Sequence, residues 1–406
     1  MGIWVPGTEA EIETVTASGT TPEGHFLDFK RELGSTASSR KETAQDIASF
    51  ALDGGVLIVG VDEPSSGVYV MSPQPLVDLS ERAEQIAANR PDPGLYVRTT
   101  VIPSHDDPSI GYLVIEVPPS PAAPHMVDGR YWGRSERTKR QLNDAEVARL
   151  HAARTLSDLK VIDALNEELA RDPEPRPGSR MLFVAEPLVA DESLGRNFVR
   201  GGPTAARALT TGSEDRVPEI VREHSPTPGE LSASVRRAKG VAVTSLAEGR
   251  KTPSENFFAE VAADVEVQTT GAIRGVMSRL TYLEEHPRVP AGTKRVLESL
   301  PIAWSHRLVA WAGALGEQLE YRGPWGFGVH LYGLEGSTAS PQDGTGMRIL
   351  SSRSLPVYEA PTYRSTTTAT FQEICDEPLE VVDRLVGDLI HSLGVSNRYP
   401  DCFPGQ

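Results

Sequence analysis

The chain has 406 residues, of which 39% are hydrophobic and 24% charged, and a formal net charge of −16, as is typical of a soluble globular protein long enough for two domains. It has no run of about 18 apolar residues and only two cysteines, which excludes a membrane-spanning helix, a disulfide framework and a cysteine-based zinc site. Because the first residues also lack the basic segment of a secretory signal, we expect a cytoplasmic protein with no membrane partner.

The N-terminal elements follow an acidic lead-in over residues 1–19. The pattern at 26–30 predicts a short strand. Ser39 and Glu42 form a capping box that begins a helix through Phe50, and Gly54-Gly55 ends that helix. Residues 56–61 are continuously apolar, which is typical of a central strand covered on both faces, and Asp62 lies at its end.

Short strands and one helix are expected in the rest of this domain. The strands are predicted at 68–70, 95–102 and 112–117, and the helix at 76–88. Asp128-Gly129 marks the tip of a hairpin. Asn143 and Glu146 then begin a helix that runs towards Leu169, and we place the domain boundary at Thr155.

The C-terminal half carries weaker signals. Residues 156–200 are predicted to form a helix and a connecting segment, with a strand at 181–184. Residues 201–256 are rich in Gly, Pro, Ser and Thr, which indicates a linker or partial disorder. Residues 257–406 are typical of an α+β domain, with helices expected at 257–286, 294–320 and 379–393 and strands at 325–331 and 363–371.

The first group of residues with chemical potential surrounds the strand at 26–30. Asp28 and Lys30 would point to the same face of that strand, Glu23 precedes it, and Asp62 ends the central strand, where ligands gather in α/β sheets. The carboxylates of Glu23, Asp28 and Asp62 suit Mg²⁺ or Mn²⁺, and Lys30 would neutralise charge on a phosphate under attack. Spacing alone favours the simpler interpretation of an ion pair across a sheet face.

The second group is the hairpin after Asp128-Gly129. Residues 130–140 carry five Lys/Arg against one Glu, although residues 1–154 as a whole hold 14 Lys/Arg against 22 Asp/Glu. Cations beside Tyr131 and Trp132 combine phosphate-reaching and stacking groups, as single-stranded nucleic acids favour. Since those two aromatic residues alternate, one should be in the core, and charge alone indicates a solvated face. The candidate contacts are Arg130, Trp132, Arg134, Arg137, Lys139 and Arg140.

These motifs occur in the order of a known family. The chain has E-x4-D-F-K from Glu23, then RKETAQDIASFALDGGVLIVGVDE, and last PHMVDGRYWGRSERTKRQL. Over about residues 20–155 this order resembles the Schlafen AlbA-like domain, whose pattern is E-x4-E-F-K, an A-F-A-N-x-x-G-G-x-L-x-x-G-V-x-D segment and a Y-x-R-x-G-S hairpin. Asp28 stands where the family has Glu, and Leu52 where Asn is usual.

The resemblance implies an α/β (α+β) fold with an N-terminal mixed sheet and flanking helices. The patterns in the rest of the chain predict that a separate α+β domain follows. Vertebrate Schlafen members include RNA endonucleases whose three acids match Glu23, Asp28 and Asp62, whereas bacterial members are described as DNA-binding or regulator-like. ATP is not expected as a cofactor, because Gly249-Arg250-Lys251-Thr252 misses the P-loop spacing by one inserted arginine.

Two functions that involve nucleic acid stay open. The first is a nucleic-acid-binding, metal-dependent endoribonuclease of Schlafen type in defence or stress response, with Glu23, Asp28, Lys30 and Asp62 as catalytic residues. The second is a non-catalytic DNA-binding transcriptional regulator with a C-terminal sensing or interaction domain. Both predict RNA or DNA as the partner and leave homo-oligomerisation open. The overall acidity also permits a pure interaction protein.

Overall fold

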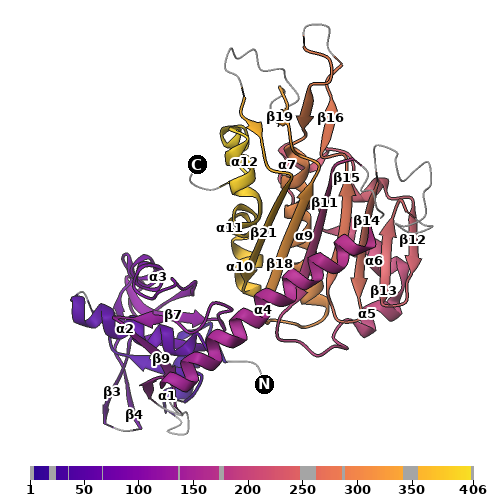
Figure 1. Cartoon of the computed structure of the whole chain (residues 1–406). Coiled ribbons are helices and arrows are strands. Elements are labelled where there is room, and N and C mark those ends of the chain that lie inside the picture. Colours follow the sequence, from indigo (N-terminus) through magenta and orange to yellow (C-terminus); the bar gives the residue numbers. More distant parts are fainter. Residues whose placement is uncertain are drawn as a thin grey trace. The chain divides into compact units, whose positions relative to one another are not determined.

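The computed structural model describes residues 4–17, 24–34, 36–65, 67–135, 138–172, 178–246, 262–285, 289–341 and 355–403. They form two compact units, Met1–Thr155 and Leu156–Gln406, each built from helices and strands (Figure 1). The expected α+β class is confirmed. Among the described residues, no helix is long and apolar enough to cross a membrane.

A mixed five-stranded sheet forms the centre of the N-terminal unit. Its strands lie in the order β1 (Leu27–Lys30), β2 (Gly55–Val59), β7 (Ile110–Val117) and β5 (Gln74–Pro75), and β6 (Arg98–Pro103) also pairs with β7. β1 and β2 are parallel, whereas β7 runs antiparallel to β2, β5 and β6. This arrangement confirms the mixed sheet expected for this part of the chain.

Side chains that alternate along β2 give this sheet two apolar faces. Leu57 and Val59 belong to a core shared with α2 (Ala37–Phe50) and α3 (Leu79–Asn89). Val56 and Ile58 belong to a second core, shared with α1 (Glu9–Ala17) and the hairpin of β3 (Val61–Ser65) and β4 (Val68–Met71). β2 is therefore buried along its whole length, as its continuous apolar run predicts.

α2 begins earlier than the capping-box pattern indicated. Its N-cap is Thr36, whose hydroxyl accepts a hydrogen bond from the Ser39 amide at 3.2 Å. The chain turns after this helix at Gly54, which has a φ of +86°. Gly55 is also required, because a Cβ at this position would overlap the Phe50 ring.

A three-stranded sheet of β8 (Met126–Val127), β9 (Arg130–Arg134) and β10 (Lys139–Gln141) completes this unit. Its first turn has positive φ at Asp128 (49°) and Gly129 (75°), as the predicted Asp-Gly turn requires. α4 (Asp144–Arg171) follows with the predicted reciprocal cap, in which the Glu146 amide donates to Asn143 Oδ1 at 3.0 Å and the Asn143 amide to the Glu146 carboxylate at 2.9 Å.

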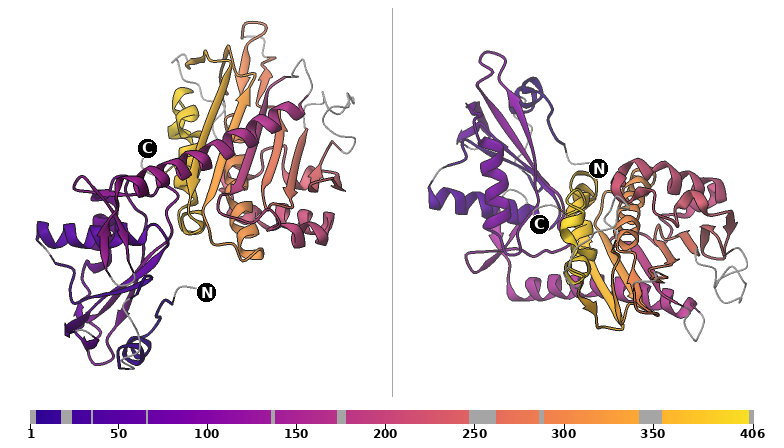
Figure 2. Two further views of the ribbon diagram at one scale, coloured as in Figure 1. Left: turned by 60° about the horizontal axis from the view of Figure 1, so that its bottom comes forward. Right: turned by 90° about the horizontal axis from the view of Figure 1, so that it is seen from above.

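The second unit is built on a seven-stranded antiparallel sheet. Residues 161–165 of α4 pack on one of its faces against Val184, and α9 (Ser299–Gln318) lies on the other against Phe183 (Figure 2). The strand order is β12 (Ala233–Arg236), β13 (Gly240–Thr244), β14 (Ala263–Gln268), β15 (Ile273–Ser278), β11 (Arg180–Pro187), β18 (Trp325–Tyr332) and β21 (Thr362–Ala369).

Smaller elements complete the second unit. A four-stranded sheet contains β16 (Thr281–Leu283), β17 (Lys294–Val296), β19 (Ser337–Ala339) and β20 (Val357–Tyr358). The short α-helices are α5 (Arg196–Gly201), α6 (Pro203–Gly212), α7 (Glu219–Arg222), α10 (Phe371–Asp376), α11 (Pro378–Val382) and α12 (Asp388–Ser392). Single 3-10 turns lie at Glu214–Arg216, Pro228–Glu230 and Ser396–Arg398, and a π-helical turn at Asp383–Gly387 joins α11 to α12.

The second unit differs from the sequence-based expectation in three places. Residues 201–246 form α6, α7, β12 and β13 instead of a linker, since Val241 and Val243 are fully buried in the sheet. Residues 262–285 form β14 to β16 instead of a helix. The helix expected from residue 294 begins at Ser299, after β17. The predicted strands at 181–184, 325–331 and 363–371 and the helix at 379–393 are confirmed, whereas residues 247–261 lie outside the described part of the chain.

Candidate nucleic-acid interface

Asp28 and Lys30 lie on the face of β1 that is turned towards α2. In the sheet register they align with Leu57 and Val59, which belong to the core beneath that helix. This is the shared face that the alternation of an extended strand predicts.

Arg134, at the end of β9, forms an ion pair with Asp28, with 3.0 Å between Nη1 and Oδ2. Its guanidinium also donates to the carbonyls of Gly24 at 3.1 Å and Leu27 at 3.4 Å, and it lies 4.3 Å from the centroid of the Phe50 ring. The Arg134 side chain is 1% exposed. Arg134 therefore fastens the hairpin to β1, and a phosphate would reach it only if this ion pair broke.

Both carboxylate oxygens of Asp28 have partners. Oδ2 accepts from Arg134, and Oδ1 accepts from the Phe29 amide at 3.0 Å. Burial raises the pKa of Asp28 and outweighs the opposing charge of Arg134, while the charge of Asp46 adds to the rise. Asp46 of α2 is thus the carboxylate whose charge acts on Asp28.

Asp46 joins two lysines from different strands. Its carboxylate lies 2.7 Å from Lys30 Nζ and 2.8 Å from Lys139 Nζ, and Lys139 also donates to the Glu42 carbonyl at 3.2 Å. Burial lowers the pKa of Lys30, but Asp46 and its neighbours more than offset this effect, and the net shift is upward. Sequence reasoning missed Asp46, although an acid four residues after Glu42 and inside the buried stretch of α2 is a usable signal.

Asp62 lies in a different sheet, the two-stranded pair of β3 and β4. Its side chain is 36% exposed and lies 3.8 Å from Arg31, so Asp28 and Asp62 are paired with different arginines. In the described part of the chain, no three Asp, Glu, His or Cys side chains are placed to hold a metal ion. Asp28 and Asp62 without Glu23 therefore form no site for Mg²⁺ or Mn²⁺ by themselves, since each is paired with its own arginine. Glu23 lies outside the described residues, so a three-carboxylate site that includes it stays a prediction.

The other hairpin residues differ in their exposure. Arg130 is exposed, whereas Trp132 is partly buried against the core of α2 and donates to the Val127 carbonyl at 3.4 Å. Arg140 forms a bidentate ion pair with Glu146 at 2.8 and 2.5 Å. Among the candidate contacts that the structure describes, Arg130 is therefore the cation most open to a ligand. Arg137 lies outside the described residues.

Residues 23–143 match the family model described as Schlafen, AlbA_2. The predicted resemblance is confirmed over this stretch. A crystal structure of the DIP2311 protein from Corynebacterium diphtheriae is 18% identical to this chain, and the alignment covers 55% of this chain and 37% of that chain with a TM-score of 0.26. The chain has no match among curated proteins.

In the matched stretch, here termed the AlbA_2 domain, the first and last sequence motifs are joined to each other in the folded structure. The strand motif contributes Asp28 and Lys30, the hairpin contributes Arg134 and Lys139, and ion pairs connect the two. The family indicates a function related to nucleic acids.

Proposed function

We propose that the AlbA_2 domain binds nucleic acid through the surface formed by α2 and the hairpin of β8 to β10. The observation that carries this proposal is the Asp28–Arg134 ion pair, which joins motifs 106 residues apart in the sequence into one unit. That unit presents the exposed Arg130 beside the turn at Asp128-Gly129. Attraction between such cations and phosphates would supply most of the affinity.

In this proposal Asp28 has a structural role. To bind a metal ion it would have to release Arg134 and leave a buried guanidinium without its counter-charge, which is costly. The domain would then act as a non-catalytic binder, as expected of a nucleic-acid-binding regulator.

A metal-dependent endonuclease is the second candidate, and one observation favours it. Asp28 and Lys30 share one face of β1, and the charge of each shifts the pKa of the other. An acid and a cation side by side are what a phosphate-cleaving site requires. In that case Glu23, Asp28 and Asp62 would hold Mg²⁺ or Mn²⁺, and Lys30 would neutralise charge on the phosphate.

Binding and cleavage can be measured on the same samples of the full-length protein. Fluorescence anisotropy with labelled single-stranded RNA, single-stranded DNA and duplex DNA should show binding to at least one of them that weakens as salt is raised. Denaturing gels should show intact strands with and without Mn²⁺. Failure to bind any of the three ligands would contradict the proposal.

Asp62→Asn distinguishes the two candidates if cleavage does occur. This carboxylate is partly exposed, so the variant should fold, and Glu63→Gln on the same strand is the matched control. We expect both variants to bind nucleic acid as the wild type does, because neither residue lies on the proposed surface. Cleavage that is lost in Asp62→Asn and kept in Glu63→Gln would establish the endonuclease instead.

A further inference from the structure

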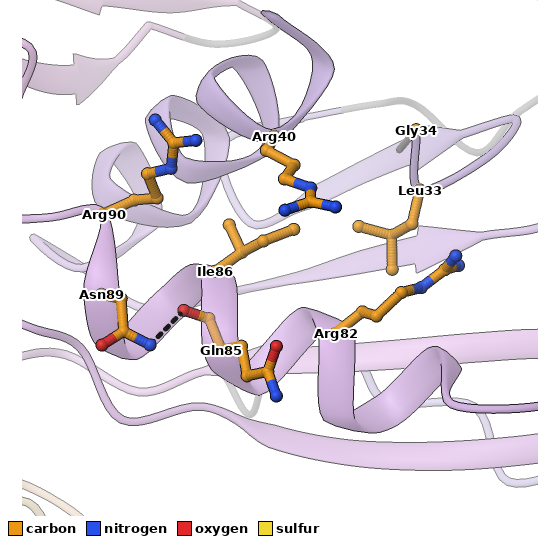
Figure 3. A pocket seen from close by; sticks show the side chains of 8 residues that line it. All are labelled: Leu33, Gly34, Arg40, Arg82, Gln85, Ile86, Asn89 and Arg90. Atoms are coloured by element: carbon orange, nitrogen blue, oxygen red, sulfur yellow. Dashed lines mark hydrogen bonds between the residues drawn. The ribbon is translucent and has the colours of Figure 1, made fainter. Parts of the chain in front are cut away.

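A second basic surface of the AlbA_2 domain lies between α2 and α3, where a pocket of about 200 Å³ opens (Figure 3). Arg40, in the first turn of α2, extends over Ile86 towards α3. Arg82 comes from α3 itself, and Arg90 follows the last residue of that helix. Leu33 and Ile86 provide an apolar wall, against which the aliphatic parts of the arginines can lie.

Among the described residues Arg40 and Arg82 form no ion pair, and no Asp or Glu lines the pocket. The Nε of Arg82 is buried without a hydrogen-bond partner. By contrast, Lys30, Lys139 and Arg134 are each neutralised by a carboxylate. Since a buried donor without a partner is unfavourable, the pocket suits a negatively charged ligand that accepts hydrogen bonds.

The size of the pocket indicates one group of a larger ligand. Pockets that enclose a whole small molecule measure roughly 300–1,000 Å³, whereas this one holds about 200 Å³. Planar guanidinium groups bind phosphate through paired hydrogen bonds. The side-chain amides of Gln85 and Asn89 line the same pocket. Each already donates one hydrogen, to Glu81 Oε1 at 3.1 Å and to the Gln85 carbonyl at 3.0 Å, and has a second one to offer.

We propose that this pocket binds one phosphate group of a nucleic-acid strand. The inference rests on the proposed function of the domain and adds a contact beyond the hairpin. The two surfaces adjoin, because Lys41, next to Arg40, forms an ion pair at 2.8 Å with Asp128 in the hairpin turn, and Arg90 lies within electrostatic reach of that carboxylate. A strand in contact with Arg130 can thus place a neighbouring phosphate in the pocket.

Salt-dependent binding of a single strand to the full-length protein tests this contact. Arg40→Gln/Arg82→Gln removes two of the guanidinium groups, and Arg98→Gln/Arg149→Gln is the charge-matched control, because both of its side chains are exposed and neither lines the pocket. We expect the pocket variant to lose roughly tenfold in affinity or more. The slope of log affinity against log salt should flatten by about 0.7, the value for one phosphate contact. The control should keep the wild-type slope.

The variant Arg40→Lys/Arg82→Lys is the control for a loss of binding that arises only from misfolding. It keeps both charges but lacks the planar fork, so it should keep the salt slope while losing part of the affinity. Unchanged affinity and slope in the glutamine variant would overturn the inference and leave the proposed function intact. Equal losses in the pocket variant and the control would also overturn it, since they would reflect net charge alone.

Binding of inorganic phosphate tests the pocket independently of the proposed function. Phosphate alone should raise the Tm of the wild type and the control, but not that of the glutamine pocket variant. If this shift occurs while the wild type binds no nucleic acid, the proposed function and the nucleic-acid source of the phosphate are both overturned.

Tighter binding of a 5′-phosphorylated strand than of its 5′-hydroxyl form, in the wild type only, would assign a terminal phosphate. Equal binding of the two forms, with the loss in the pocket variant, would assign an internal one.

Discussion

Arg134 belongs to the basic stretch at residues 130–140, but its buried side chain stabilises the fold. Its partner Asp28 lies 106 residues away in the sequence, so no local pattern could predict the ion pair. The alternation of β1 did predict that Asp28 and Lys30 share a face, because this depends only on local backbone geometry. Asp46 was missed despite its place four residues after Glu42, because its lysine partners come from β1 and β10 and are brought together only by the fold.

Replacing Arg134 should therefore affect stability first. Arg134→Met leaves Asp28 largely buried without its counter-charge and should destabilise the AlbA_2 domain by about 3 kcal/mol. In calorimetry of the full-length protein, the N-terminal transition should move down by about 10 °C. Arg130→Met, at an exposed position of the same strand, should cost less than about 0.5 kcal/mol. Similar stabilities of the two variants would argue against the structural role of Arg134.

At the level of elements, β14 and β15 were among the strands that the sequence did not predict. β14 and β15 were expected to be helical, although β14 alternates apolar and polar residues over Ala263–Gln268 as a strand does. Asp264 and Glu266 of β14 are buried as ion pairs with Arg237, at 2.6 and 3.0 Å, and this pairing depends on a neighbouring hairpin. β18 and the C-terminal amphipathic helix were predicted correctly, since their patterns are local.

α9 is buried along most of its length and includes a histidine with an altered titration. His306 is 3% exposed, and burial lowers its pKa to about 4. In the unfolded chain a histidine binds a proton near pH 6.5. The contribution of His306 to stability is therefore fully present above that pH and is lost as the pH falls towards 4. Over this window the loss amounts to about 3 kcal/mol.

Calorimetry of the C-terminal transition between pH 7 and 4 measures this effect. His306→Leu should lose about 3 kcal/mol less stability than the wild type across that range, since the group that must bind a proton is gone. The matched control is His391→Leu, at an exposed position of the same unit, and it should follow the wild type. If His306→Leu shows the wild-type pH dependence, another group must be responsible.

At the scale of the whole molecule, net charge is a poor guide to the partner. The formal charge is −16, and residues 1–154 alone carry 22 Asp/Glu against 14 Lys/Arg. Around Asp28 the positive charges are already neutralised, whereas Arg40 and Arg82 of the pocket between α2 and α3 form no ion pair among the described residues. The placement of unpaired charge, which needs the tertiary structure, therefore decides where phosphates can bind.

The claim that the AlbA_2 domain is the part of the chain that contacts nucleic acid can be tested by ultraviolet cross-linking. The full-length protein is irradiated with a bound single-stranded oligonucleotide, and mass spectrometry identifies the cross-linked peptides. We predict cross-links in peptides from α2, α3 and the β8–β10 hairpin, all within the matched residues 23–143. Cross-links confined to residues 178–403, with none in the AlbA_2 domain, would contradict this claim.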